Sequence, residues 1–115
     1  MSAEDVVAPT HQGLVAAFYL AKTGGLPKPY GARDRLLEKI NELVEAVDLD
    51  ATNTAQLKEL ADVLYVAYGY ALSRGWNLTR AFEAVHASNM TKEWTESGKV
   101  QKGAGYVPPD LRGCA

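Results

Sequence analysis

The sequence predicts an all-α protein, a helical bundle of about four helices, and three observations support this fold class. Apolar residues recur at three- and four-residue spacing, which is the helical period. Two of the segments with this spacing stop at glycines, Gly24 and Gly75, and glycine commonly ends helices. No two segments in which apolar and polar residues alternate flank a tight turn, so no strand hairpin is expected. We expect residues 1–115 to form a single domain, with residues 95–115 as an irregular tail containing glycine and proline.

Four helices are expected, over residues 10–23, 33–47, 53–74 and 78–91. The first ends at Gly24, and the two prolines of the loop at 26–31 exclude a continuing helix there. The third begins near Asn53, which with Gln56 is similar to a capping box. It ends at Gly75, and Asn77 suits the N-cap of the fourth helix.

Composition excludes several classes of partner. A formal charge of −2 and a pI of about 5.6 argue against a broad basic surface for a nucleic-acid polymer. The single cysteine, Cys114, allows no intrachain disulfide and no thiolate zinc site, which fits a reducing, cytoplasmic location. No apolar run is long enough to span a membrane, and the first residues do not resemble a secretory signal.

Asp62 is the only charged residue in the most apolar stretch of the chain, residues 60–72. Glu59 lies three residues earlier, on the same side of a helix. A carboxylate removed from water is costly, so it must be exposed, partnered or bound to a cation. The chain offers further carboxylates but no evident arginine as a partner, and this favours a metal site.

Three glutamates, Glu38, Glu42 and Glu45, form one stripe along the second helix. Side by side, the second and third helices could direct four or five carboxylates into one volume, which requires a counter-charge or raised pKa values. Ligation by oxygen alone favours Mg²⁺ or Mn²⁺. Taken alone, however, the stripe also fits a solvated face opposite the leucines.

The third helix favours the site over the solvated face. Its main apolar stripe contains Leu57, Leu60, Leu64, Tyr68 and Ala71. The acidic side nevertheless continues into Val63, Val66 and Tyr70. A helix that is apolar all round is covered all round. We therefore expect the second helix or another subunit to pack on the acidic side.

Asn89 and Lys92 continue the apolar stripe of the fourth helix. A lysine can neutralise phosphate oxygens, and an asparagine can both donate and accept hydrogen bonds. Alone, the pair fits a frayed helix end. Beside an acidic metal site it suggests polyphosphate binding. Lys102, in the tail, could close over such a ligand, although such tails are often disordered.

Together these residues resemble the MazG-like, all-α nucleoside triphosphate pyrophosphohydrolases, especially short members similar to phosphoribosyl-ATP pyrophosphohydrolase. The Glu-x-x-Asp part of the family pattern is matched by Glu59-Leu-Ala-Asp62. The preceding Glu-Glu-x-x-Glu part is matched incompletely, either from Glu38 with Lys39 as its second residue, or from Asn41 through Glu45. Residues 85–92 are similar to the Asn-x-x-Lys element, and residues 102–110 to the closing segment.

The resemblance implies a house-cleaning enzyme that hydrolyses a nucleotide, such as a deoxynucleoside triphosphate, to the monophosphate and pyrophosphate. It implies Mg²⁺ held by Glu42, Glu59 and Asp62, with Glu38 or Glu45 completing the site, and one carboxylate as the base. The residues expected to bind substrate are Tyr65, Asn89, Lys92, Lys102 and Tyr106. A homodimer or dimer of dimers is also implied. The alternatives are phosphoribosyl-ATP as substrate, or an inactive oligomeric bundle.

Overall fold

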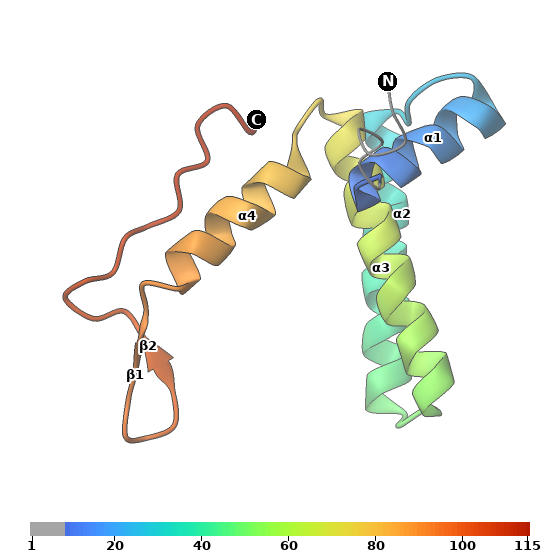
Figure 1. The fold of residues 1–115 in the computed structure, drawn as a ribbon. Helices are drawn as coiled ribbons and strands as arrows, with labels where there is room; N and C mark the ends of the chain where they lie inside the picture. Colours follow the sequence, from blue (N-terminus) through green and yellow to red (C-terminus); the bar gives the residue numbers. More distant parts are fainter. Residues whose placement is uncertain (1–8) are drawn as a thin grey trace. The chain divides into compact units, whose positions relative to one another are not determined.

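The computed structural model describes residues 9–115. In this part of the chain the helices are α1 (His11–Thr23), α2 (Pro29–Asp48), α3 (Asn53–Ser73) and α4 (Leu78–Asn89) (Figure 1). A short antiparallel hairpin follows, formed by β1 (Glu93–Trp94) and β2 (Val100–Gln101). The predicted all-α class with about four helices is confirmed, whereas the expectation of no strand hairpin is wrong. No helix of the described residues is long and apolar enough to cross a membrane.

The helix ends follow local chemistry, with two corrections. Helix α2 begins at Pro29, four residues earlier than predicted, because proline is well suited to the first helical turn. The N-cap of α3 is Thr52, whose hydroxyl accepts a hydrogen bond from the Ala55 backbone N–H at 3.2 Å, so Asn53 is not the cap. The predicted cap at Asn77 is confirmed by the bond that its side chain accepts from the Arg80 N–H.

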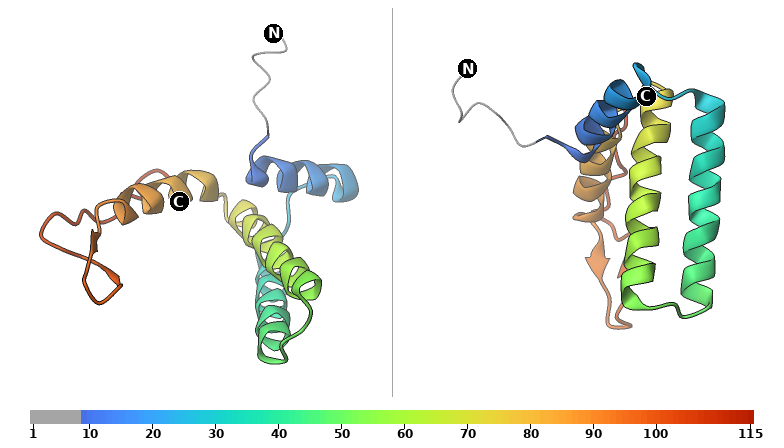
Figure 2. Two further views of the ribbon diagram at one scale, coloured as in Figure 1. Left: turned by 60° about the horizontal axis from the view of Figure 1, so that its bottom comes forward. Right: turned by 90° about the vertical axis from the view of Figure 1, so that its right-hand side faces the viewer.

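The chain forms two compact units, one up to Trp76 and one from Asn77 onward, and each is described by itself. In the first unit α2 and α3 run antiparallel, side by side (Figure 2), and α1 packs on α3. Val15 of α1 is buried, as are Val66 and Tyr68 of α3. A Cβ added at Gly69 would lie 3.3 Å from the Tyr19 hydroxyl, so glycine permits the close approach of α1 to α3.

The main apolar stripe of α3 is only partly covered within the single chain. Tyr68 and Ala71 are buried, as expected for core residues. Leu57, Leu60 and Leu64 are instead 66%, 55% and 47% exposed. The amino-terminal half of this stripe therefore remains an open apolar surface.

In the second unit, hydrogen bonds hold the tail against α4. The Ser88 hydroxyl donates to the Val107 carbonyl at 2.7 Å, and the Val107 N–H donates to the Thr91 hydroxyl at 2.9 Å. At the other end of α4, the Asn77 N–H donates to the Cys114 carbonyl at 2.7 Å. Residues 102–115 lack regular secondary structure, yet they are tied to both ends of this helix.

Candidate functional site

Five charged side chains form one network on the facing helices α2 and α3, which we call the carboxylate–lysine cluster. Its members are Lys39 and Glu42 on α2, and Lys58, Glu59 and Asp62 on α3. The Lys39 Nζ lies 3.0 Å from Glu42 Oε2 and 3.7 Å from Asp62 Oδ2. The Lys58 Nζ lies 2.6 Å from Asp62 Oδ2 and 3.8 Å from Glu59 Oε1. Helix α2 therefore covers the acidic side of α3, which is one of the two arrangements that we expected.

The two lysines of the cluster differ in burial and in what they connect. The Lys39 side chain is 18% exposed and reaches from α2 to a carboxylate on α3. The Lys58 side chain is 62% exposed, and both of its partners belong to its own helix. An exposed ion pair contributes little because water screens it. Lys39 is thus the lysine whose positive charge is paired with carboxylates on both helices.

The ion pairs shift the pKa values of the cluster in opposite directions. The hydrogen bond from Lys39 lowers the pKa of Glu42, and the same bond raises the pKa of Lys39. The hydrogen bond from Lys58 is the main cause that lowers the pKa of Asp62, and it raises the pKa of Lys58. Glu42 and Asp62 are therefore held in the ionised form that binds cations.

Glu59 has a carboxylate oxygen, Oε2, that is buried without a hydrogen-bond partner. Buried polar atoms in native proteins are normally paired, so such an oxygen requires an explanation. Its neighbours in the cluster supply further carboxylate oxygens and no imidazole or thiolate. This donor set fits a cation that prefers oxygen ligands, as Mg²⁺ and Mn²⁺ do.

The structure brings only part of the predicted metal site together. Glu42, Glu59 and Asp62 belong to the cluster. Glu38 and Glu45 are exposed and take no part in its ion pairs. In residues 9–115, no three carboxylate, imidazole or thiolate side chains are grouped as a metal would require. Lysines occupy the space between the carboxylates instead.

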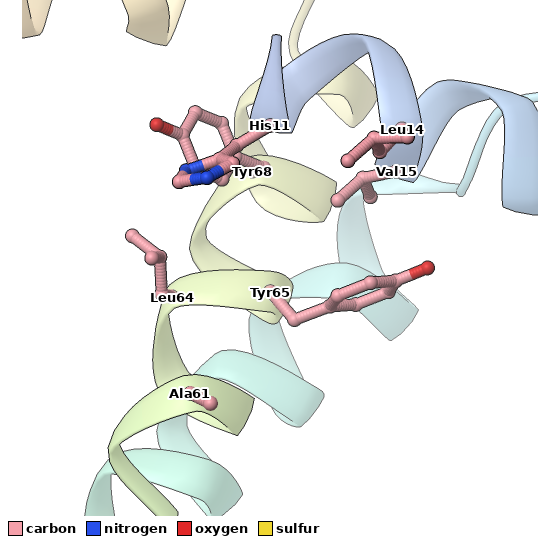
Figure 3. Close-up of a pocket in the computed structure, with 7 residues that line it drawn as sticks. All are labelled: His11, Leu14, Val15, Ala61, Leu64, Tyr65 and Tyr68. Carbon is pink, nitrogen blue, oxygen red and sulfur yellow. The ribbon is translucent and has the colours of Figure 1, made fainter. Parts of the chain in front are cut away.

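Tyr65 lies one helical turn beyond Asp62 on α3 and takes no part in the ion pairs. With residues of α1 and α3 it lines an apolar pocket of about 130 Å³ (Figure 3). The other lining residues are His11, Leu14, Val15, Ala61, Leu64 and Tyr68. The Tyr65 ring is 40% exposed and meets the Phe18 ring edge-on, with 5.7 Å between the ring centres. A planar apolar group could therefore contact Tyr65 here.

The remaining predicted substrate residues belong to the second unit. Helix α4 ends at Asn89, so Lys92 follows the helix and does not extend its stripe, contrary to the prediction. The Lys92 N–H donates to the Asn89 carbonyl at 3.1 Å in the turn that follows. In the tail, the Lys102 ammonium lies 5.0 Å from the centre of the Tyr106 ring, within cation–π range.

The sequence interpretation missed the two lysines as partners of Asp62. Lys58 precedes Asp62 by four residues, and this spacing predicts a neighbour on the helix surface. The sequence alone therefore contained a signal for Lys58 as the partner of Asp62. The pairing of Lys39 with Asp62 joins two helices, so no local spacing could have indicated it.

The resemblance predicts carboxylates from two neighbouring helices at one site, and the cluster brings Glu42 of α2 together with Glu59 and Asp62 of α3. Residues 20–89 match the family model described as phosphoribosyl-ATP pyrophosphohydrolase, and the chain belongs to this family. The match spans α2, α3 and α4 completely. It confirms the MazG-like superfamily and supports a nucleotide pyrophosphohydrolase kind of activity. No curated protein matches the chain significantly.

Proposed function

We propose that the protein is a Mg²⁺-dependent pyrophosphohydrolase that converts a nucleoside or deoxynucleoside triphosphate to the monophosphate and pyrophosphate. The observation that carries this proposal is the partnerless, buried Oε2 of Glu59, beside the ionised carboxylates of Glu42 and Asp62. These groups belong to a member of a pyrophosphohydrolase family. Carboxylate oxygens are suited to a hard divalent cation that accompanies a polyphosphate.

Each site residue has a role in this proposal. Glu42, Glu59 and Asp62 hold Mg²⁺, or Mn²⁺ in its place, and Glu38 or Glu45 completes the ligand set. The cation supplies positive charge to the phosphate oxygens. A cluster carboxylate takes a proton from the attacking water, whose oxygen bonds to the α-phosphorus while the bond to the bridging oxygen breaks and pyrophosphate leaves.

The groups outside the cluster bind the rest of the substrate. Lys92 neutralises phosphate charge, and Asn89 orients the phosphate chain by hydrogen bonds. Lys102 and Tyr106, which are in contact in the tail, bind the substrate as well. Tyr65 offers an aromatic surface to the base, consistent with its exposure at the apolar pocket. We propose that clearance of unwanted nucleotides is the resulting biological role.

A second candidate substrate is phosphoribosyl-ATP, which fits the family match at least as well. Its hydrolysis breaks the same kind of phosphoanhydride bond, so the roles proposed for the cluster are unchanged. The difference lies in the additional ribosyl phosphate, which requires further positive charge or hydrogen-bond donors. The two candidates therefore differ in substrate recognition and share their chemistry.

We further propose that the protein works as a homodimer or a dimer of dimers. The exposed stripe of Leu57, Leu60 and Leu64 supports this, because an open row of large apolar side chains is typical of an interface. A shallow hollow of about 400 Å³ lies beside the stripe, between α2 and α3, and Leu57 and Leu60 belong to its lining. A second copy would bury this surface.

The test is to incubate the protein with Mg²⁺ and each common nucleoside and deoxynucleoside triphosphate, and with phosphoribosyl-ATP. Monophosphate and pyrophosphate are quantified, and Asp62→Asn is the paired variant. We expect pyrophosphate release from at least one substrate, and its loss in the variant. Release from phosphoribosyl-ATP alone would select the second candidate. No release from any substrate, with Mg²⁺ and with Mn²⁺, would favour the inactive bundle.

A further inference from the structure

Lys39 lies at the centre of the carboxylate–lysine cluster, in contact with both helices. We propose that its ammonium group is a built-in counter-ion that competes with a divalent cation for Glu42 and Asp62. The identity of the competing cation rests on the proposed function. The structure assigns Lys39 a role in setting metal affinity, beyond any role in folding.

The geometry supports competition because Lys39 donates a hydrogen bond to Glu42 and is ion-paired with Asp62, two of the carboxylates proposed as ligands. Its Nζ lies 3.0 Å from Glu42 Oε2 and 3.7 Å from Asp62 Oδ2. These oxygens cannot surround a divalent cation while an ammonium group lies between them. Accordingly, the described residues contain no grouped set of three metal-binding side chains, although the cluster holds three carboxylates.

Burial makes Lys39 harder to displace than Lys58. The Lys39 side chain is 18% exposed, whereas that of Lys58 is 62% exposed and can move into water without breaking a contact between helices. Charge interactions strengthen as water is excluded. Removal of Lys39 should therefore change the local electrostatic potential more than removal of Lys58.

The net charge of the cluster gives further support. With three carboxylates and two ammonium groups, the cluster carries a formal charge of −1. We expect a weak affinity for the free cation and stronger binding when the cation arrives with the nucleotide phosphates.

Titration of the nucleotide-free protein with Mn²⁺ tests the proposal. The free ion is measured by electron paramagnetic resonance for the wild type, Lys39→Met and Lys58→Met. Lys39→Met should bind Mn²⁺ about tenfold more tightly or better, because a cation a few ångströms from the metal is removed. Lys58→Met is the matched control, and its affinity should change by less than about threefold because its charge is screened by water.

An unchanged affinity in Lys39→Met, or an equal gain in Lys58→Met, would overturn the proposal. Absence of Mn²⁺ binding in all three proteins would also overturn it. If Lys39→Met does not fold, Lys39→Gln, which keeps a polar group, is titrated instead. The binding measurement requires no turnover, so the two proposals can fail separately. If only the proposed hydrolysis fails, no pyrophosphate is released while the Mn²⁺ affinities follow the prediction.

Discussion

Val15→Ala should destabilise the first unit strongly. Val15 is 2% exposed, at the contact of α1 with α3, so both of its side-chain methyl groups are lost from the interior. Burial contributes about 0.8 kcal/mol per methylene-sized group, which gives about 1.6 kcal/mol for two. The remaining cavity adds roughly 1 kcal/mol at about 24 cal/mol per Å³. We therefore expect a loss of about 2–3 kcal/mol in the free energy of unfolding.

The matched control is the neighbouring residue, Leu14, which has the larger side chain but is 49% exposed. Leu14→Ala should cost about 1 kcal/mol, since half of its surface is already in water. Urea denaturation monitored by circular dichroism gives both values, and Val15→Ala should also melt about 10 °C lower. A loss below about 1 kcal/mol for Val15→Ala would refute the burial argument. The burial argument would also be refuted if, at low protein concentration, Leu14→Ala lost more free energy of unfolding than Val15→Ala.

Two further predictions concern charge and assembly. The pKa values of Glu42 and Asp62 are lowered in the folded protein. Their ion pairs therefore contribute fully to stability above the ordinary pKa values of 4.5 and 3.8, and this contribution is lost as the pH falls through the lowered pKa values. The pKa values of the two cluster lysines are raised, so their contribution to stability is complete below pH 10.5 and is lost at higher pH. On the acid side, a urea midpoint that stays unchanged below pH 3.8 would contradict the ion pairs of the carboxylates. Sedimentation velocity should give at least twice the mass of the 12.4 kDa chain, and Leu60→Ser should shift it toward the monomer. A wild-type protein that sediments as a monomer at micromolar concentration would exclude the homodimer.

Much of the fold could be predicted because helices depend on short-range spacing. The 3.6-residue period located all four helices, and the ends at Gly24 and Gly75 follow from the left-handed conformation that glycine adopts easily. The hairpin was missed because its strands have two residues each, too few to show alternation. It depends on the turn between Thr95 and Lys99, where the Thr95 N–H and hydroxyl both donate to the Lys99 carbonyl.

The candidate site could likewise be predicted only in part from the sequence. The Glu-x-x-Asp spacing placed Glu59 and Asp62 on one side of α3, and the apolar residues around them indicated that this side is covered. The spacing on α2 did not distinguish among Glu38, Glu42 and Glu45. The structure brings Glu42 to the cluster and leaves the other two exposed, because the rotation of α2 about its axis depends on how it packs.

The set of helices and the acidic side of α3 follow from the sequence alone, since both arise from residues three or four positions apart. The position of Lys39 between Glu42 and Asp62, and the burial of Glu59 Oε2 without a partner, depend on the tertiary fold. These features arise where two helices meet. The pairing of side chains there depends on the packing of α2 against α3, which spacing along one helix does not encode.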